Sequence, residues 1–454
     1  MLNLQNLYPL IKKHNLNGPR YTSYPTALEL KLDVNKPAIL ENIKTGQGEL
    51  SIYMHIPFCK KLCYYCGCHK QIARNTDKSD PYVEQLKQEI KIWAEEFKAY
   101  SVKQIHFGGG TPTFLANHQL IALVNEVKNN FEMVGDIELN IEVDPRTVNG
   151  ERLEDLIKLG FNRFSFGIQD FSQETQIAIN RVQSLEQIEE IVAVMNKYQE
   201  VTYNLDLIYG LPYQTEFSFK QTLDKVITLA PDRISLFNYA HLPARFPEQN
   251  KIKNVTLPNS EVKLAIQLMA IETLSDAGYV YIGIDHFAKP EDKLAKALAE
   301  GKLHRNFQGY TTHGNQALLG LGVSSISQIG DVMFQNTKSL TEYASQIDEG
   351  KAPIISNMFK NQDDKIRAEV IKDLLCNLEV NLKEIERKYN IEDRKYFESE
   401  IEALAKFTQD NLVEVNEDKL VRIKREGRFF ARSIASVFDI YLNKSNQAKF
   451  SKVI

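Results

Sequence analysis

The residues best suited to chemistry are four cysteines that lie within ten residues of one another: Cys59, Cys63, Cys66 and Cys68. Thiolates are soft ligands that suit iron-sulfur clusters and zinc. A zinc site with four thiolates normally draws two ligand pairs from separated segments, whereas these cysteines share one short loop. The spacing therefore favours an iron-sulfur cluster over zinc. It does not decide whether three or four of the cysteines bind metal.

A second group of chemically distinctive residues stands where expected strands end. These positions are Gly108, Gly109, Gly110, Glu142, Asp144, Gln169, Asp206 and residues 238–241. Glycine lets a ligand approach the backbone closely, although a triple glycine alone is weak support for a site. Because the carboxyl ends of parallel strands meet at one rim, we expect these residues to converge on the cysteine loop.

The elements that must position these residues alternate between strand and helix. Strands are expected at 50–56, 102–107, 137–143, 163–168, 201–208 and 233–239, with helices at 81–97, 120–131, 151–159, 184–198 and 216–229. Such alternation predicts a parallel sheet with helical crossovers, but periodicity alone does not separate a doubly wound sheet from a barrel. Chemistry-bearing residues at several strand ends favour the barrel. We therefore expect an α/β fold with a partial, open TIM-like (βα)6 barrel.

The chain divides into three expected parts. Residues 1–49 carry many turn formers and form an N-terminal arm, residues 50–360 form the catalytic domain, and residues 361–454 form a mainly helical C-terminal domain. The last part predicts helices at 366–378, 382–389 and 396–407 before a hairpin at 412–423, an outline that resembles a winged helix. Its basic residues are interpreted as a solvated face rather than as a nucleic-acid site.

Composition excludes several classes of protein. Hydrophobic residues make up 43% and charged residues 25% of the 454 residues, the balance of a soluble globular protein. The net charge of -4 gives no general attraction to nucleic acid or to an anionic membrane. With no leader sequence and no apolar run long enough to span a bilayer, we expect a cytoplasmic protein. The lone Cys376 is interpreted as a buried small hydrophobic residue.

The cysteine spacing, with Tyr65 directly before Cys66, resembles the signature of the radical S-adenosylmethionine superfamily. Within that superfamily, segments along nearly the whole chain resemble the oxygen-independent coproporphyrinogen III oxidases. These segments are 18–26, 53–70, 108–113, 142–146, 167–170, 206–212, 237–241, 285–287 and 304–312.

The resemblance implies a 4Fe-4S cluster and two molecules of S-adenosylmethionine. Three cysteines, here Cys59, Cys63 and Cys66, would bind the cluster, which leaves Cys68 as a neighbour. One S-adenosylmethionine would contact Tyr53, Gly109, Glu142 and Ile326. The other would contact Tyr65, Gly110, Thr111, Gln169, Arg181, Asp206 and Ala240.

The implied reaction is the oxidative decarboxylation of two propionates of coproporphyrinogen III to vinyl groups, which yields protoporphyrinogen IX in anaerobic haem synthesis. A 5'-deoxyadenosyl radical would carry it, so no side chain is expected to act as a catalytic residue. The resemblance also implies an electron donor such as flavodoxin or ferredoxin. We expect a monomer that binds neither nucleic acid nor membrane.

The substrate carries four carboxylates, and the planar fork of arginine suits carboxylates best. Arg20, Arg146 and Arg305 are the candidates, with internal ion pairs as the alternative interpretation. Two other functions compete with the oxidase: a haem-binding relative of the same superfamily that acts as a haem chaperone, and a plain iron-sulfur electron carrier. The segments 18–26 and 304–312, together with Cys68 after Gly67, favour the oxidase.

Overall fold

The computed structural model describes residues 4–14, 18–314, 316–391 and 395–442, which form two compact units. We call one of them the sheet unit, which comprises Leu30–Ala277 and Asn315–Phe359. The other, here the terminal unit, comprises Met1–Glu29, Gly278–Gly314 and Lys360–Ile454. These units group residues 278–314 with the two ends of the chain. The three parts expected from sequence, with boundaries after residues 49 and 360, stay a prediction.

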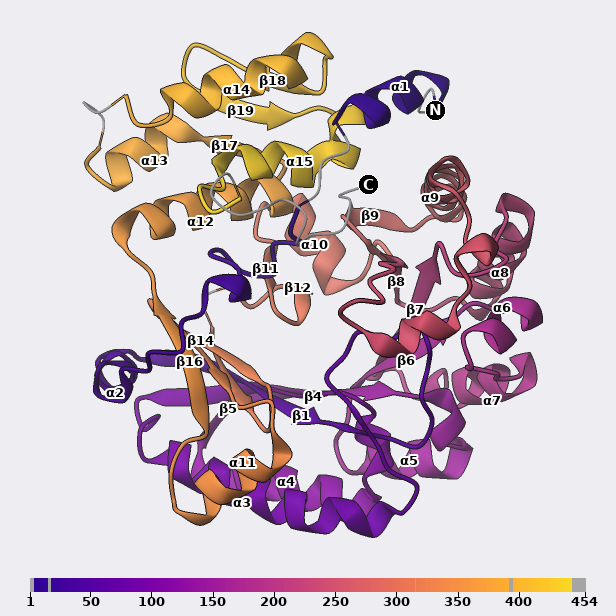
Figure 1. The fold of residues 1–454 in the computed structure, drawn as a ribbon, viewed down its shortest axis with the longest axis vertical. Helices are drawn as coiled ribbons and strands as arrows, with labels where there is room; N and C mark the ends of the chain where they lie inside the picture. Colours follow the sequence, from indigo (N-terminus) through magenta and orange to yellow (C-terminus); the bar gives the residue numbers. More distant parts are fainter. Residues whose placement is uncertain (1–3, 15–17, 315, 392–394, 443–454) are drawn as a thin grey trace. The chain divides into compact units, whose positions relative to one another are not determined.

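Six parallel strands form the centre of the sheet unit (Figure 1). They are β1 (Gly48–Ile56), β4 (Tyr100–Gly109), β5 (Glu132–Val143), β6 (Arg163–Gln169), β7 (Thr202–Tyr209) and β8 (Arg233–Asn238). Each pairs in parallel with the next in this order. In β1 the side chains of Leu50, Ile52, Met54 and Ile56 are fully buried. Burial of this kind is typical of parallel sheets covered by helices. The expected α/β fold is confirmed.

Helices follow each of the six strands and cover the sheet from outside, as Figure 1 shows for α3 and α4 beside β1, β4 and β5. They are α3 (Asp80–Ala94), α4 (Asn117–Asn130), α5 (Gly150–Lys158), α6 (Gln173–Ala178), α7 (Leu185–Met195), α8 (Glu216–Leu229) and α9 (Ser260–Asp276). Side-chain caps fix where three of these helices begin. The side chains of Ser184, Thr215 and Asn259 each accept a hydrogen bond from a backbone amide in the first turn of α7, α8 and α9. In the part of the chain that is described, every helix is too short or too polar to cross a lipid bilayer.

Four further strands extend the sheet beyond β1, in the order β16-β15-β14-β13-β1. β13 (Ala317–Leu321) pairs with β1 in parallel, whereas β14 (Ile326–Ile329), β15 (Val332–Asn336) and β16 (Ile354–Phe359) run antiparallel to their neighbours. Helix α11 (Leu340–Asp348) connects the last two. This extension was not predicted, and it makes β1 an interior strand.

The expected N-terminal arm contains two helices, α1 (Leu4–His14) and α2 (Lys36–Thr45). The apolar periodicity of α2 is weak, but the helix has clear local signals at its start. The side chain of Asn35 accepts a hydrogen bond from the Ala38 amide, and Pro37 lies in the first turn. Capping therefore sets the start of this helix.

The C-terminal part of the terminal unit has the element order of a winged helix. It contains α12 (Gln362–Cys376), β17 (Glu379–Asn381), α13 (Leu382–Lys388), α14 (Glu398–Gln409), β18 (Val413–Val415), β19 (Leu420–Ile423) and α15 (Ala431–Ala435). The predicted hairpin is confirmed, since Val413 pairs with Ile423 across β18 and β19. Cys376 is fully buried. The same unit holds β9 (Val280–Gly283), β10 (His286–Ala288), α10 (Lys293–Ala299) and the hairpin of β11 (His304–Asn306) and β12 (Gly309–Thr311).

Candidate active site at the cysteine loop

The cysteines lie on a loop that leaves the carboxyl end of β1 and is closed by two short parallel strands. β2 (Phe58–Cys59) pairs with β3 (Gln71–Ile72), with Cys59 opposite Ile72. The amide of Ala73 donates a 3.0 Å hydrogen bond to the carbonyl of Cys59. The three other clustered cysteines therefore stand on one tied loop.

Hydrogen-bond donors surround the sulfurs of the two buried cysteines. The hydroxyl of Thr111 donates to Cys59 Sγ over 3.3 Å. Arg146 and Arg181 each donate to Cys63 Sγ, over 3.4 Å and 3.5 Å. Burial raises the pKa of the Cys59 thiol to about 11. Without a metal, this thiol is therefore neutral, and a bound cation is what would keep it as a thiolate.

Cys66 is partly buried and Cys68 is exposed. The amide of Cys68 donates to Cys66 Sγ over 3.4 Å. Hydrogen bonding from Cys68 and the nearby charge of Lys70 lower the pKa of Cys66 to about 6. Lys70 also donates to the Cys66 carbonyl over 3.1 Å and forms an ion pair with Glu248. The Cys66 thiol is therefore largely ionised at neutral pH even without a metal.

The arrangement fits an iron-sulfur cluster. Among the described residues, no three cysteine, histidine or carboxylate side chains are close enough to share a single metal ion. Donors at the sulfurs of Cys59 and Cys63 also match the negative charge of a thiolate-bound cluster.

Asp144 joins the two arginines that face Cys63. It accepts a 2.7 Å bond from Arg146 Nη2 and a 3.3 Å bond from Arg181 Nη1. Burial acts to raise the pKa of Asp144, but the charges of Arg181 and Arg146 hold it below its ordinary value. Arg181 is only 6% exposed and also donates to the Gly167 carbonyl over 2.7 Å. Without the family resemblance, Arg181 would have been interpreted as an exposed cation.

Side chains from neighbouring loops tie the cysteine loop in place. Asn180 donates to the Leu62 carbonyl over 2.7 Å. The buried Gln249 donates to the carbonyl of Tyr65 over 3.0 Å and to that of Ala240 over 3.3 Å. Sequence reasoning missed Gln249 and Asn180. Amides in loops carry no spacing signal, and only the fold shows which carbonyls they meet.

The glycines at the end of β4 have no room for a side chain. Gly109 has a φ of +112°, and a Cβ there would lie 2.6 Å from the ring of His55. A Cβ on Gly110 would lie 2.7 Å from the Pro57 carbonyl. The amide of Gly109 donates to Glu142 Oε2 over 3.1 Å. Close packing against the start of the loop explains the glycines, in addition to the ligand access expected from sequence.

Carboxylates from β5 and β7 complete this rim. Glu142 lies near the end of β5, but Asp206, which was expected at a strand end, lies within β7. His106 packs against the ring of Tyr53 with centroids 5.7 Å apart, and its Nε2 lies 3.4 Å from Glu142 Oε1. Asp206 accepts a 2.9 Å bond from the Ser165 hydroxyl. Burial, together with the charge of Glu142, raises the pKa of Asp206 to about 6. Of the remaining predicted residues, Gln169 ends β6 with a φ of 70°, and Ile326 begins β14.

A buried carboxylate supports the sheet next to the loop. Glu89 of α3 is fully buried and accepts hydrogen bonds from the Gly322 amide over 2.7 Å, the Tyr343 hydroxyl over 2.6 Å and Asn336 Nδ2 over 2.7 Å. Burial raises its pKa to about 7. Glu89 thereby links helix α3 to the segment that connects β13 and β14.

The three candidate arginines for the substrate have different surroundings. Arg146 lies at the cysteine loop, and each of its guanidinium nitrogens already has a partner, which matches the alternative of an internal ion pair. Arg20 and Arg305 belong to the terminal unit. Arg20 lies 3.4 Å from Asp285. Arg305 stacks on Tyr310, and its buried Nε and Nη1 have no hydrogen-bond partner among the described residues.

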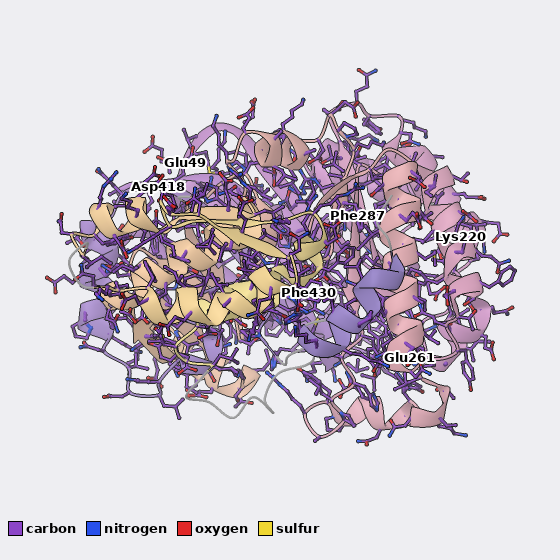
Figure 2. The ribbon with its side chains drawn as sticks, turned by 90° about the horizontal axis from the view of Figure 1, so that it is seen from above. Glu49, Lys220, Glu261, Phe287, Asp418 and Phe430 are labelled. Atoms are coloured by element: carbon purple, nitrogen blue, oxygen red, sulfur yellow. The ribbon has the colours of Figure 1, made fainter. Side chains whose placement is uncertain are left out.

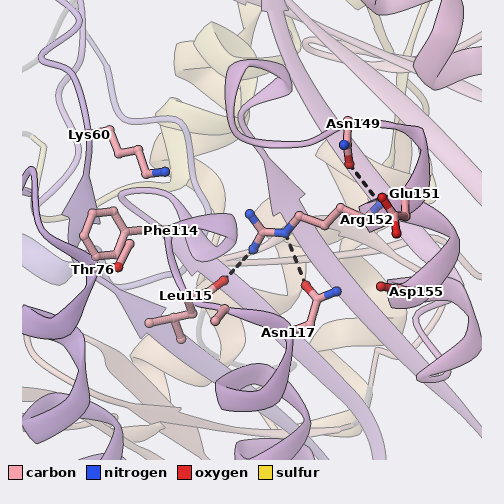
Figure 3. A pocket seen from close by; sticks show the side chains of 10 residues that line it. Lys60, Thr76, Phe114, Leu115, Asn117, Asn149, Glu151, Arg152 and Asp155 are labelled. Carbon is pink, nitrogen blue, oxygen red and sulfur yellow. Dashed lines mark hydrogen bonds between the residues drawn. The ribbon is translucent and has the colours of Figure 1, made fainter.

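An open hollow of about 390 Å³ lies beside the cysteine loop. Figure 3 shows Lys60 and Phe114 on one side of it and Arg152 on the other. Arg152 is held by the Leu115 carbonyl and by the side chain of Asn117. Lys60, which directly follows Cys59, is the second cation that lines this hollow.

Comparison with known proteins gives consistent results. Residues 53–226 match the family model of the radical SAM superfamily. The chain is 46% identical over 451 residues to an oxygen-independent coproporphyrinogen III oxidase of Escherichia coli, covering 98% of both chains. It is 44% identical over 452 residues to the protein of the same name in Pseudomonas aeruginosa, again covering 98% of both. A solved structure described as coproporphyrinogen III oxidase from Escherichia coli, a radical SAM enzyme, superimposes with a TM-score of 0.91 at 45% identity, over 96% of this chain and 98% of that one.

Proposed function

The chain belongs to the oxygen-independent coproporphyrinogen III oxidases of the radical SAM superfamily, and from this membership we propose how its residues serve that reaction. The protein is an oxidase that converts two propionates of coproporphyrinogen III to vinyl groups. The product is protoporphyrinogen IX, a precursor of haem. The observation that carries this assignment is the 46% identity over 98% of both chains. The haem chaperone is not favoured, because relatives that match along the whole chain bear the oxidase name.

The enzyme uses a 4Fe-4S cluster and S-adenosylmethionine, which when bound together supply the radical that removes hydrogen from the substrate. We assign the cluster to Cys59, Cys63 and Cys66. Arg146 and Arg181, with Asp144 between them, hold Cys63 from one side. We assign no metal ligand to the exposed Cys68.

Two S-adenosylmethionine sites are part of the proposal. Tyr53, Gly109, Glu142 and Ile326 would bind the first molecule. Tyr65, Gly110, Thr111, Gln169, Arg181, Asp206 and Ala240 would bind the second. In support, Glu142 presents a fixed carboxylate at the rim, which suits a cationic or hydroxyl-bearing ligand. The guanidinium of Arg181, by contrast, already has partners in Gly167, Asp144 and Cys63. Its role there is to shape the site rather than to make the main contact.

Arg20 and Arg305 are proposed to bind carboxylates of the substrate. Arg305 has the better support, because buried guanidinium N–H groups without partners are costly unless a ligand satisfies them. We no longer propose Arg146, whose donors are occupied within the protein. Further expectations are a flavodoxin or ferredoxin as electron donor, a monomeric state, a cytoplasmic location, and no binding to nucleic acid or membrane.

The test of the function is anaerobic incubation of the reconstituted protein with dithionite, S-adenosylmethionine and coproporphyrinogen III. We expect protoporphyrinogen IX, carbon dioxide and 5'-deoxyadenosine. A fully reconstituted protein that forms none of them contradicts the assignment. The Cys59→Ala variant is the matched control, and it should lose both the cluster absorbance and the products.

A further inference from the structure

We propose that an exposed basic segment beside the cysteine loop is the docking surface for an acidic one-electron carrier protein. This basic docking surface consists of five residues: Lys60, Lys61, Ile72, Arg74 and Lys78. The inference rests on the proposed function, because an enzyme of this kind needs a protein that reduces its cofactor. It adds the place where that donor binds.

The first support is charge. Lys60, Lys61, Arg74 and Lys78 are all exposed, and in the described part of the chain none of them is paired with a carboxylate. The whole chain has a net charge of -4, so this group of unpaired cations is a local exception. Two acidic residues, Asp77 and Asp80, lie in the same segment, and Asp80 accepts a 2.6 Å bond from Gln119. Cations therefore dominate this surface, which suits an acidic partner.

The second support is proximity to the proposed cluster ligands. Ile72 lies opposite Cys59 in the pairing of β2 with β3. Its side chain is 41% exposed, which is unusual for isoleucine and gives the surface an apolar centre. A carrier that covers Ile72 is separated from Cys59 by a single strand. Electron transfer between proteins requires such a short separation.

The third support is shape. Lys60 and Thr76 both line the open hollow of about 390 Å³, with Phe114 between them in Figure 3. The exposed Glu151 and Asp155 line its far side. An acidic partner is attracted to the Lys60 side and repelled from the Glu151 side, which limits the orientations in which it binds.

A docked carrier would give up one electron to the 4Fe-4S cluster that Cys59, Cys63 and Cys66 would hold, with no atom or proton transferred. Redox partners of this type form small, polar and short-lived complexes, so a few exposed cations suffice to guide them. Their binding weakens as salt screens the charges.

The experiment compares two double variants with the same change in charge. Arg74→Glu with Lys78→Glu reverses the basic docking surface outside the cysteine loop. Lys220→Glu with Lys225→Glu makes the same change on α8, where Lys220 stands at the surface (Figure 2). Binding of purified flavodoxin to each protein is measured by biolayer interferometry at low and high ionic strength. The rate at which reduced flavodoxin or dithionite bleaches the cluster absorbance is measured separately.

We expect the Arg74 and Lys78 variant to bind flavodoxin about tenfold more weakly at low ionic strength and to be reduced correspondingly more slowly by it. Reduction by dithionite should be equal in all proteins, and the α8 variant should match the wild type. Equal flavodoxin binding by both variants and the wild type overturns the proposal. A wild-type protein that forms no product with dithionite would instead contradict the proposed function, and the binding comparison would be unaffected.

Discussion

The backbone amide of Gly109 donates a 3.1 Å hydrogen bond to Oε2 of Glu142 and so joins the carboxyl ends of β4 and β5. The other oxygen of the same carboxylate lies 3.4 Å from His106 Nε2. A carboxylate held from two sides needs little reorganisation when a ligand arrives. This relationship fixes the direction in which the carboxylate of Glu142 faces a ligand at the rim.

Replacement of Glu142 by alanine should therefore weaken binding of S-adenosylmethionine without loss of the cluster. A hydrogen bond to a charged group contributes roughly 1.5–3 kcal/mol, so we expect a loss of about ten- to a hundredfold in affinity. Equilibrium dialysis with the cofactor measures it. Glu132→Ala, at the opposite end of β5, is the control and should bind as the wild type does. Unchanged affinity in Glu142→Ala would remove this residue from the proposed site.

Gly109→Ala should destabilise the protein more than Gly48→Ala. Both glycines have positive φ angles, of +112° and +123°, so both substitutions strain the backbone. A Cβ on Gly109 meets the His55 ring at 2.6 Å, whereas one on Gly48 meets nothing within 4 Å. We expect a difference of about 2 kcal/mol in the free energy of unfolding, measured by urea denaturation. If the two variants lost the same free energy of unfolding, the His55 ring would have to move aside without cost.

Asp144→Ala should cost about 3 kcal/mol of stability, because it leaves the buried Arg181 and the partly buried Arg146 without their shared counter-ion. The same variant should take up less iron during reconstitution, since Arg146 and Arg181 no longer have a fixed position at Cys63. Asp155→Ala removes an exposed carboxylate from α5 and serves as the control. Iron content and thermal unfolding report the two effects independently.

Glu89 should give the protein a characteristic dependence of stability on pH. Its pKa is about 7 in the folded protein, against an ordinary value of 4.5. Between these values the folded protein holds a proton that the unfolded chain has released, so the free energy of unfolding falls as the pH rises and levels off above about pH 7. The full change is about 3 kcal/mol. In Glu89→Gln, this pH dependence of the free energy of unfolding should disappear. Glu84 is exposed on the same helix, so Glu84→Gln is the control and should keep the dependence. Identical slopes in the wild type and Glu89→Gln would show that Glu89 stays ionised throughout.

Arg305→Ala should raise the KM for coproporphyrinogen III by about tenfold or more, because a charged hydrogen bond to a carboxylate is lost. Arg305→Lys should recover only part of the loss, since lysine lacks the planar fork. Lys302→Ala, an exposed cation near the same hairpin, is the control. If substrate affinity and turnover are both unchanged in Arg305→Ala, the assignment is wrong.

The six βα units were predictable because their strands are apolar runs and their helices have one apolar face. β14 and β15 were not, because strands of four and five residues joined by glycine turns carry no clear period. The cysteines were found from spacing alone. Asp144 was recognised only as a strand-end residue. Its pairing with Arg146 joins residues two apart in the sequence, but its pairing with Arg181 depends on how the chain after α6 returns to the sheet, which no local pattern encodes.

The interior position of β1 has a consequence for the order in which the protein is made. Leu50 pairs with Val102 on one side and with Ala317 on the other. In a chain growing from its N-terminus, the first partner emerges early, but the second follows only after all six βα units. Until then β1 has an open edge, which invites pairing with other chains. The sheet around β1 is therefore completed only after residues 317–321 have been made, and the edge that β13 covers is the last side of β1 to be protected.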